Sequence, residues 1–76
     1  MNNQRRKTIA KSLEKLKKAS ALLAEVKAAE ETSMKSIPMD DEFDEKRDAI
    51  EAIADGLENV ISSIEESIDT LDNTDF

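Results

Sequence analysis

The sequence predicts an all-α protein: a two-helix antiparallel hairpin that assembles with copies of itself into a homo-oligomeric helical bundle. Apolar residues recur at helical spacing in both halves of the chain, and the only proline, Pro38, lies between the halves. The charge is also divided there. Residues 1–38 carry nine Lys or Arg and four Asp or Glu, whereas residues 39–76 carry two and fourteen. A chain of 76 residues allows one domain, spanning residues 1–76.

The first helix is expected at about residues 3–35. Large apolar residues lie at helical intervals and are interleaved with alanines: Ile9, Leu13, Leu16, Leu22, Leu23 and Val26. Asn2 or Asn3 is suited to cap the start of this helix. The helix should end before Pro38, because the residue ahead of a proline avoids the helical region.

A turn at 36–40 should lead into a second helix at about residues 41–71, followed by a flexible acidic tail at 72–76. Asp40 is the expected N-cap. Five apolar residues recur at intervals of seven: Phe43, Ile50, Leu57, Ile64 and Leu71. Others fall three or four positions after them, which indicates a broad apolar stripe rather than a narrow coiled-coil seam.

Charges at the helix ends favour the antiparallel arrangement. Arg5, Arg6 and Lys7 lie at a helix start, where positive charge opposes the helix dipole, and Glu65 and Asp69 lie near a helix end, where negative charge opposes it. An antiparallel hairpin places these two ends side by side, so that the charges compensate each other. A parallel pair would leave both uncompensated.

Self-association is expected because two helices alone form a small core. With no Cys and no His, the chain has neither disulfides nor the usual zinc ligands to stabilise it. The stripe of the second helix is wider than one partner helix covers, so we expect a homo-oligomer, most simply a two-fold dimer. The expected oligomer core is Ile50, Ile53, Leu57, Val60, Ile61, Ile64 and Ile68.

The composition argues against an enzyme, and no catalytic residue, cofactor or metal site is predicted. There is no His, Cys or Tyr, Gly56 is the only glycine, and no calcium-loop spacing is present. Neither a signal peptide nor a membrane span is found, so we expect a cytoplasmic protein that does not contact membranes. Gly56 either permits close approach of another helix or is simply tolerated within the second helix.

A row of carboxylates along the second helix is the first candidate binding surface. It contains about one charge per helical turn: Asp41, Asp44, Asp48, Glu51, Asp55, Glu58, Glu65, Asp69 and Asp72. Such a row suits a DNA mimic that occupies the basic cleft of a nucleic-acid-binding protein. Alternatively, it is a solvated face that keeps the protein soluble, which is the commoner role of such a row.

Cations form the second candidate surface. Arg5, Arg6, Lys46 and Arg47 are candidate phosphate contacts, with Lys46 and Arg47 near the hairpin tip. The alternative for Lys46 and Arg47 is ion pairing with Glu30 and Glu31. Direct nucleic-acid binding is not expected, given the net charge of −7 and the absence of stacking aromatics near the cations.

Four stretches resemble a family of small helical-hairpin proteins from phages and prophages of Gram-positive bacteria. These are 2–7 (NNQRRK), 34–39 (MKSIPM), 49–53 (AIEAI) and 63–69 (SIEESID). The chain departs from this family in its turn, at Met39, Asp40 and Asp41. The resemblance implies a phage origin, a hairpin shape and a place in the cytoplasm of a bacterial host cell, and it supplies no site residue.

This resemblance suggests a host-directed role. The first hypothesis is a non-enzymatic accessory protein that binds and inhibits a host protein, as an anti-defence or host-takeover factor, through its acidic face. The alternatives are an oligomeric sponge that sequesters a nucleotide defence signal and a purely structural or assembly protein.

Overall fold

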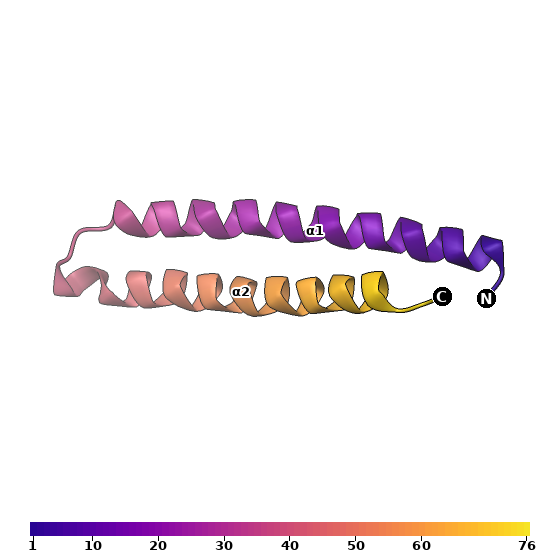
Figure 1. Cartoon of the computed structure of the whole chain (residues 1–76). Helices are drawn as coiled ribbons and strands as arrows, with labels where there is room; N and C mark the ends of the chain where they lie inside the picture. Colours follow the sequence, from indigo (N-terminus) through magenta and orange to yellow (C-terminus); the bar gives the residue numbers. More distant parts are fainter.

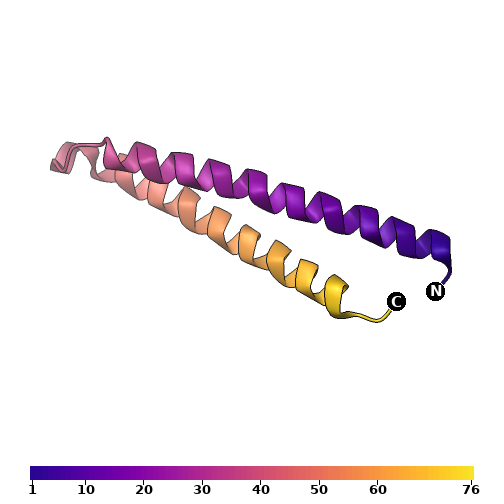
Figure 2. The same cartoon turned by 45° about the horizontal axis from the view of Figure 1, so that its top comes forward.

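The chain folds into two long helices and contains no strand, which confirms the all-α class. The computed structural model describes residues 1–76 and contains α1 (Asn3–Lys35), one turn of 3-10 helix, η1 (Asp41–Phe43), and α2 (Asp44–Asn73). Figure 1 shows α2 returning beside α1 in the opposite direction, with both termini at one end and the turn at the other. The Cα positions extend over 60 × 14 × 13 Å, and the turned view of Figure 2 shows the same side-by-side arrangement.

The bounds of α1 have local causes. The Oδ1 atom of Asn2 accepts a hydrogen bond from the backbone N–H of Arg5 at 2.8 Å, so Asn2 is the N-cap. At the other end, the backbone N–H groups of Ser36 and Ile37 reach back to Ser33 and Met34, and the helix stops ahead of Pro38. The helix spans the same residues as predicted from the sequence.

The second helix begins later and ends later than predicted. Residues 41–43 form the 3-10 turn, in which the N–H of Phe43 donates to the carbonyl of Asp40 at 3.0 Å. The side chain of Asp40 makes no capping hydrogen bond, so the expected side-chain cap is absent. α2 continues to Asn73, which means that the expected tail at 72–76 is helical for its first two residues.

The core is a single narrow line of contact, here called the seam. In both helices the less exposed residues recur at alternating intervals of three and four, apart from Ala19. In α1 they are Ile9, Leu13, Leu16, Ser20, Leu23, Lys27, Glu30 and Met34. In α2 they are Arg47, Ile50, Ala54, Leu57, Ile61, Ile64, Ile68 and Leu71. Because only α1 can cover α2, these residues face each other along the pair.

Little of this seam is shielded from solvent. Only Ser20, Ala54 and Ile61 are buried among 76 residues, and each keeps 7–9% of its surface exposed. The α1 side of the seam is polar at Ser20, Lys27 and Glu30, whereas the α2 side is apolar from Ile50 to Leu71. Polar residues of α1 therefore face an apolar line of α2 over part of the seam. Neither helix is long and apolar enough to cross a membrane.

Candidate interaction faces

The position of a residue relative to the seam decides which side of the molecule it occupies. Successive residues of an α-helix are rotated by about 100° around the helix axis. The residues directly before and directly after a seam residue therefore lie on opposite sides of the seam. Because the two helices are antiparallel, the residues that precede seam residues in α1 and in α2 share one side of the molecule. Those that follow seam residues share the other side.

The carboxylates of α2 are gathered on one of these sides, here called the acidic face. Eight of the nine predicted row residues directly follow Phe43 or a seam residue: Asp44, Asp48, Glu51, Asp55, Glu58, Glu65, Asp69 and Asp72. Asp41 lies apart, in the 3-10 turn. The two ion pairs between the helices lie on this side: Lys17 to Asp72 at 3.9 Å and Lys27 to Glu58 at 3.1 Å. The structure thus brings eight of the nine predicted row residues together along one face and leaves Asp41 outside it.

Lys27 is the charged seam residue of α1 that pairs across the helices with the acidic face. Its Nζ atom lies 2.9 Å from a carboxylate oxygen of Glu31 and 3.1 Å from one of Glu58. Hydrogen bonds to Glu31 and then to Glu58 raise the pKa of Lys27 above its ordinary value of 10.5. Lys27 thus connects a neighbour on its own helix with a residue of α2.

The predicted phosphate contacts do not converge within one chain. Arg5 and Arg6 lie at the end that holds both termini, where the Nε atom of Arg6 donates to the carbonyl of Phe76 at 3.0 Å. Lys46 and Arg47 lie near the turn, at the opposite end of the molecule. The four cations are therefore divided between the two ends.

The guanidinium of Arg47 is already engaged at the turn. It donates to the carbonyls of Pro38 and Asp40 and pairs with Asp44, three residues earlier on its own chain. The ion pairs expected from Lys46 and Arg47 to Glu30 and Glu31 are absent, since Glu31 pairs with Lys27 instead. Lys46 lines an open hollow of about 470 Å³ at the turn, together with Glu30.

The side opposite the acidic face exposes four large apolar residues, here called the apolar face: Leu22, Val26, Ile53 and Val60. Their exposed fractions are 52%, 48%, 49% and 48%. Each directly precedes a seam residue, which places all four on one side. Lys27 reaches Glu58, so Val26 and Val60, close to these two in sequence, lie at similar levels along the molecule.

The predicted oligomer core divides between the seam and the apolar face. Ile50, Leu57, Ile61, Ile64 and Ile68 occupy the seam and contact α1, while Ile53 and Val60 stay exposed. Sequence reasoning missed Leu22 and Val26 as members of an outward face. The periodicity of α1 alone gives no signal for this, because Lys27, the seam residue that follows Val26, is polar.

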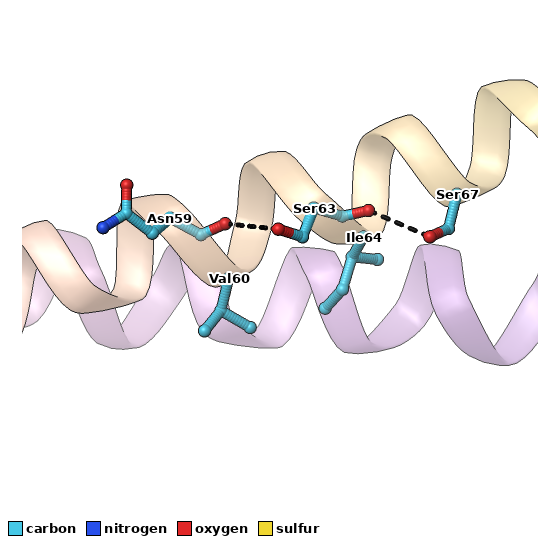
Figure 3. A pocket seen from close by; sticks show the side chains of 5 residues that line it. All are labelled: Asn59, Val60, Ser63, Ile64 and Ser67. Carbon is cyan, nitrogen blue, oxygen red and sulfur yellow. Dashed lines mark hydrogen bonds between the residues drawn. The ribbon is translucent and has the colours of Figure 1, made fainter.

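Hydroxyl groups accompany the apolar face. Beside Val60 lies an open hollow of about 300 Å³, lined by Asn59, Val60, Ser63, Ile64 and Ser67. Figure 3 shows the hydroxyls of Ser63 and Ser67 donating to carbonyls one turn back on their own helix, each at 3.0 Å. No group of three or more metal-ligating side chains occurs in the chain. This side of the molecule thus offers methyl groups and internally bonded hydroxyls.

Comparison with protein-family models, with curated proteins and with solved structures found no match to this chain.

Proposed function

We propose that this chain is a non-enzymatic binding protein: an antiparallel helical hairpin that assembles with copies of itself and uses the acidic face to bind and inhibit a basic partner protein. The observation that carries the proposal is that most carboxylates of that face are unpaired. Of its eight carboxylates, Asp48, Glu51, Asp55, Glu65 and Asp69 make no ion pair in the chain.

The facing positions of α1 explain why these charges stay unpaired. Four of the α1 residues that directly follow a seam residue are exposed alanines: Ala10, Ala21, Ala24 and Ala28. Lys17 is the cation on this side that pairs with the row. The six remaining Lys and Arg of the first eighteen residues do not pair with α2. An acidic row set against alanines has its charge available for another molecule.

The most suitable partner is a protein with a basic cleft, such as one that binds nucleic acid. Regularly spaced carboxylates on a straight helix offer such a cleft a linear array of negative charge, and desolvated charge pairs there give both attraction and orientation. In the phage setting that the sequence resemblance suggests, the partner would be a host protein and the result would be inhibition. No observation favours the alternative of a nucleotide sponge, since its four cations are divided between the two ends of the molecule.

The experiment is affinity capture from a Gram-positive bacterial lysate, followed by binding measurements on the captured protein. The test variant combines Asp48→Asn, Glu51→Gln and Asp55→Asn, which neutralises three unpaired carboxylates of the acidic face. The matched control combines Glu25→Gln, Glu45→Gln and Glu66→Gln, which removes the same charge from exposed positions off that face.

We expect the test variant to bind the captured protein at least about tenfold more weakly, and the control to bind nearly as the wild type does. DNA should compete with the wild-type chain, and binding should fall steeply with salt. A partner that binds both triple variants equally well, or that still binds tightly at high salt, would contradict the proposal.

A further inference from the structure

We infer that the apolar face is the surface through which two copies of this chain pack face to face, forming a four-helix arrangement with both acidic faces outward. This inference gives the proposed assembly a specific interface. It does not depend on whether the acidic face binds a partner, because the two faces lie on opposite sides of the molecule.

The single chain exposes more surface than a compact protein of its size. Its accessible surface is 5883 Å². A folded monomer of 8.5 kDa has about 4,700 Å², so the excess is roughly 1,200 Å². One broad side of a molecule measuring 60 Å by 14 Å offers about 800 Å², the area that each partner contributes to a standard interface. Covering one such side removes most of the excess.

Charge selects which side a second copy can cover. Two chains of net charge −7 repel each other unless they meet where carboxylates are absent. Among the residues that precede Phe43 or a seam residue in either helix, Glu42, at the turn, is the only carboxylate. Packing through the apolar face therefore brings no row of like charges together and keeps the acidic faces apart. The apolar face is therefore the side that a second copy of this acidic chain can approach with the least repulsion.

The hydroxyls on this side can be buried without losing hydrogen bonds. Six precede a seam residue, and each donates to the carbonyl four residues earlier on its own helix: Thr8, Ser12, Ser33, Ser63, Ser67 and Thr70. A buried hydroxyl with its own partner carries little desolvation penalty. Ser62, which directly follows Ile61 and lies on the acidic side, makes no such bond.

Gly56 gains a role in this arrangement. It precedes the seam residue Leu57 and lies between Ile53 and Val60 on the same side of α2. Apart from the neighbouring residues and backbone of its own helix, a Cβ added at Gly56 would have no atom within 4 Å, so packing inside the single chain does not require a glycine. A large side chain of the second copy, such as Leu22 or Val26, fits against the exposed backbone there.

The first test measures mass by sedimentation at micromolar concentration. We expect twice the 8.5 kDa chain mass for the wild type. Val60→Lys places a charge at the centre of the proposed interface and should give the single-chain mass. Ala52→Lys adds the same charge to an exposed α2 position away from both the seam and the apolar face, and should remain a dimer. A wild type with the single-chain mass, or a Val60→Lys variant that stays dimeric, would overturn the inference.

A second test keeps the inference falsifiable if Val60→Lys fails to fold. The chain has no cysteine, so Ser62→Cys and Ser63→Cys each introduce one thiol, and both positions are exposed in the single chain. Only Ser63 lies on the apolar side. We expect its thiol to react with an aromatic disulfide reagent at least about tenfold more slowly at high protein concentration than at low concentration, because dimers form by mass action. The thiol at position 62 should react at one rate throughout.

Equal reactivity of the two thiols at every concentration would overturn the inference, whatever the outcome of the partner capture. Conversely, loss of partner binding in the acidic-face variant with unchanged dimer mass would support the proposed function by itself. The two proposals thus have separate readouts and can fail separately.

Discussion

The two sides of this helical pair are built from the same two helices, yet they differ in almost every property. One side holds eight carboxylates from α2 set against alanines of α1, and the other exposes four large apolar residues among hydroxyls. The difference arises from positions one residue before or one residue after a common seam. It shows that charge is segregated around α2 as well as between the two halves of the sequence.

This arrangement changes how the basic first half and the acidic second half are understood. Direct pairing between the helices is limited to Lys17 with Asp72 and Lys27 with Glu58, both partly exposed. Such pairs contribute little individually. The segregated charge therefore contributes little to the stability of the hairpin, and its main effect is on which other molecules each side attracts or repels.

The largest effect should come from the seam, which both sides share. Ile61 is the most buried apolar residue, with 7% of its surface exposed. Ile61→Ala should lower the free energy of unfolding by about 2–5 kcal/mol, through lost transfer energy and a residual cavity. Urea unfolding followed by circular dichroism measures the loss.

The matched control for this variant is Ile53→Ala on the apolar face. In an isolated chain, half-exposed Ile53 should cost well under half of the Ile61 value, because much of its surface is already in water. In the proposed dimer the two costs should approach each other at high protein concentration. Equal, concentration-independent costs for the two variants would contradict the distinction between seam and face.

Gly56→Ala should have the next largest effect. It should stabilise the helix of the single chain and weaken the dimer. Alanine favours the helix by about 1 kcal/mol over glycine, and the added methyl group meets nothing in the single chain. We therefore expect higher helicity at concentrations where the chain is monomeric and a weaker dimer, by about fivefold in dissociation constant for a similar energy. Sedimentation equilibrium measures the constant, and a dimer that is tighter than the wild type would contradict close approach at Gly56.

Much of the helical layout followed from the sequence because periodicity and local signals act over short distances. Asn2 and Pro38 set the ends of α1 through one side-chain hydrogen bond and one backbone restriction. The start of α2 was placed too early, since Asp41–Phe43 form a 3-10 turn whose hydrogen bonds give no periodic pattern. Eight of the nine residues of the acidic row were identified from the sequence because a helical period alone determines them, and Asp41 was misplaced because it lies in the 3-10 turn.

The division of the apolar residues could not be read from the periodicity of one helix. Ile50 and Ile53 are equivalent members of a broad apolar stripe in the sequence. Packing against α1 places only Ile50 on the line of contact. Lys27 and Glu30 are polar, yet they lie on the α1 seam, while the apolar Leu22 and Val26 are exposed. The pairing of two helices decided these positions, and pairing depends on both sequences at once.

Lys27 links the seam with the acidic face, so it should make stability depend on alkaline pH. Its pKa is raised in the folded chain, chiefly by Glu31 and then by Glu58. The stabilisation is therefore fully present below the unfolded pKa of 10.5, and it is lost as pH rises through the higher folded pKa. The urea midpoint should fall across this range in the wild type.

Lys27→Met removes this titration and should flatten that part of the profile. Lys18→Met is the control, because Lys18 is exposed and makes no ion pair. It should retain the wild-type decline. An identical decline in Lys27→Met and in the wild type would assign the alkaline loss to other groups.

The smallest expected effect concerns the carboxylates near the end of α2 and tests why the acidic face exists. Asp69 and Asp72 lie close to the carboxyl end of the helix, where negative charge is unfavourable by about 0.3–1 kcal/mol. Asp69→Asn should therefore raise the free energy of unfolding by a few tenths of a kcal/mol. Asp72→Asn should gain less, because it also loses Lys17 at 3.9 Å. Two stabilised variants would mean that the row opposes folding, and a face retained against stability is best explained by binding. Two destabilised variants would make the row structural and remove the main argument for a partner.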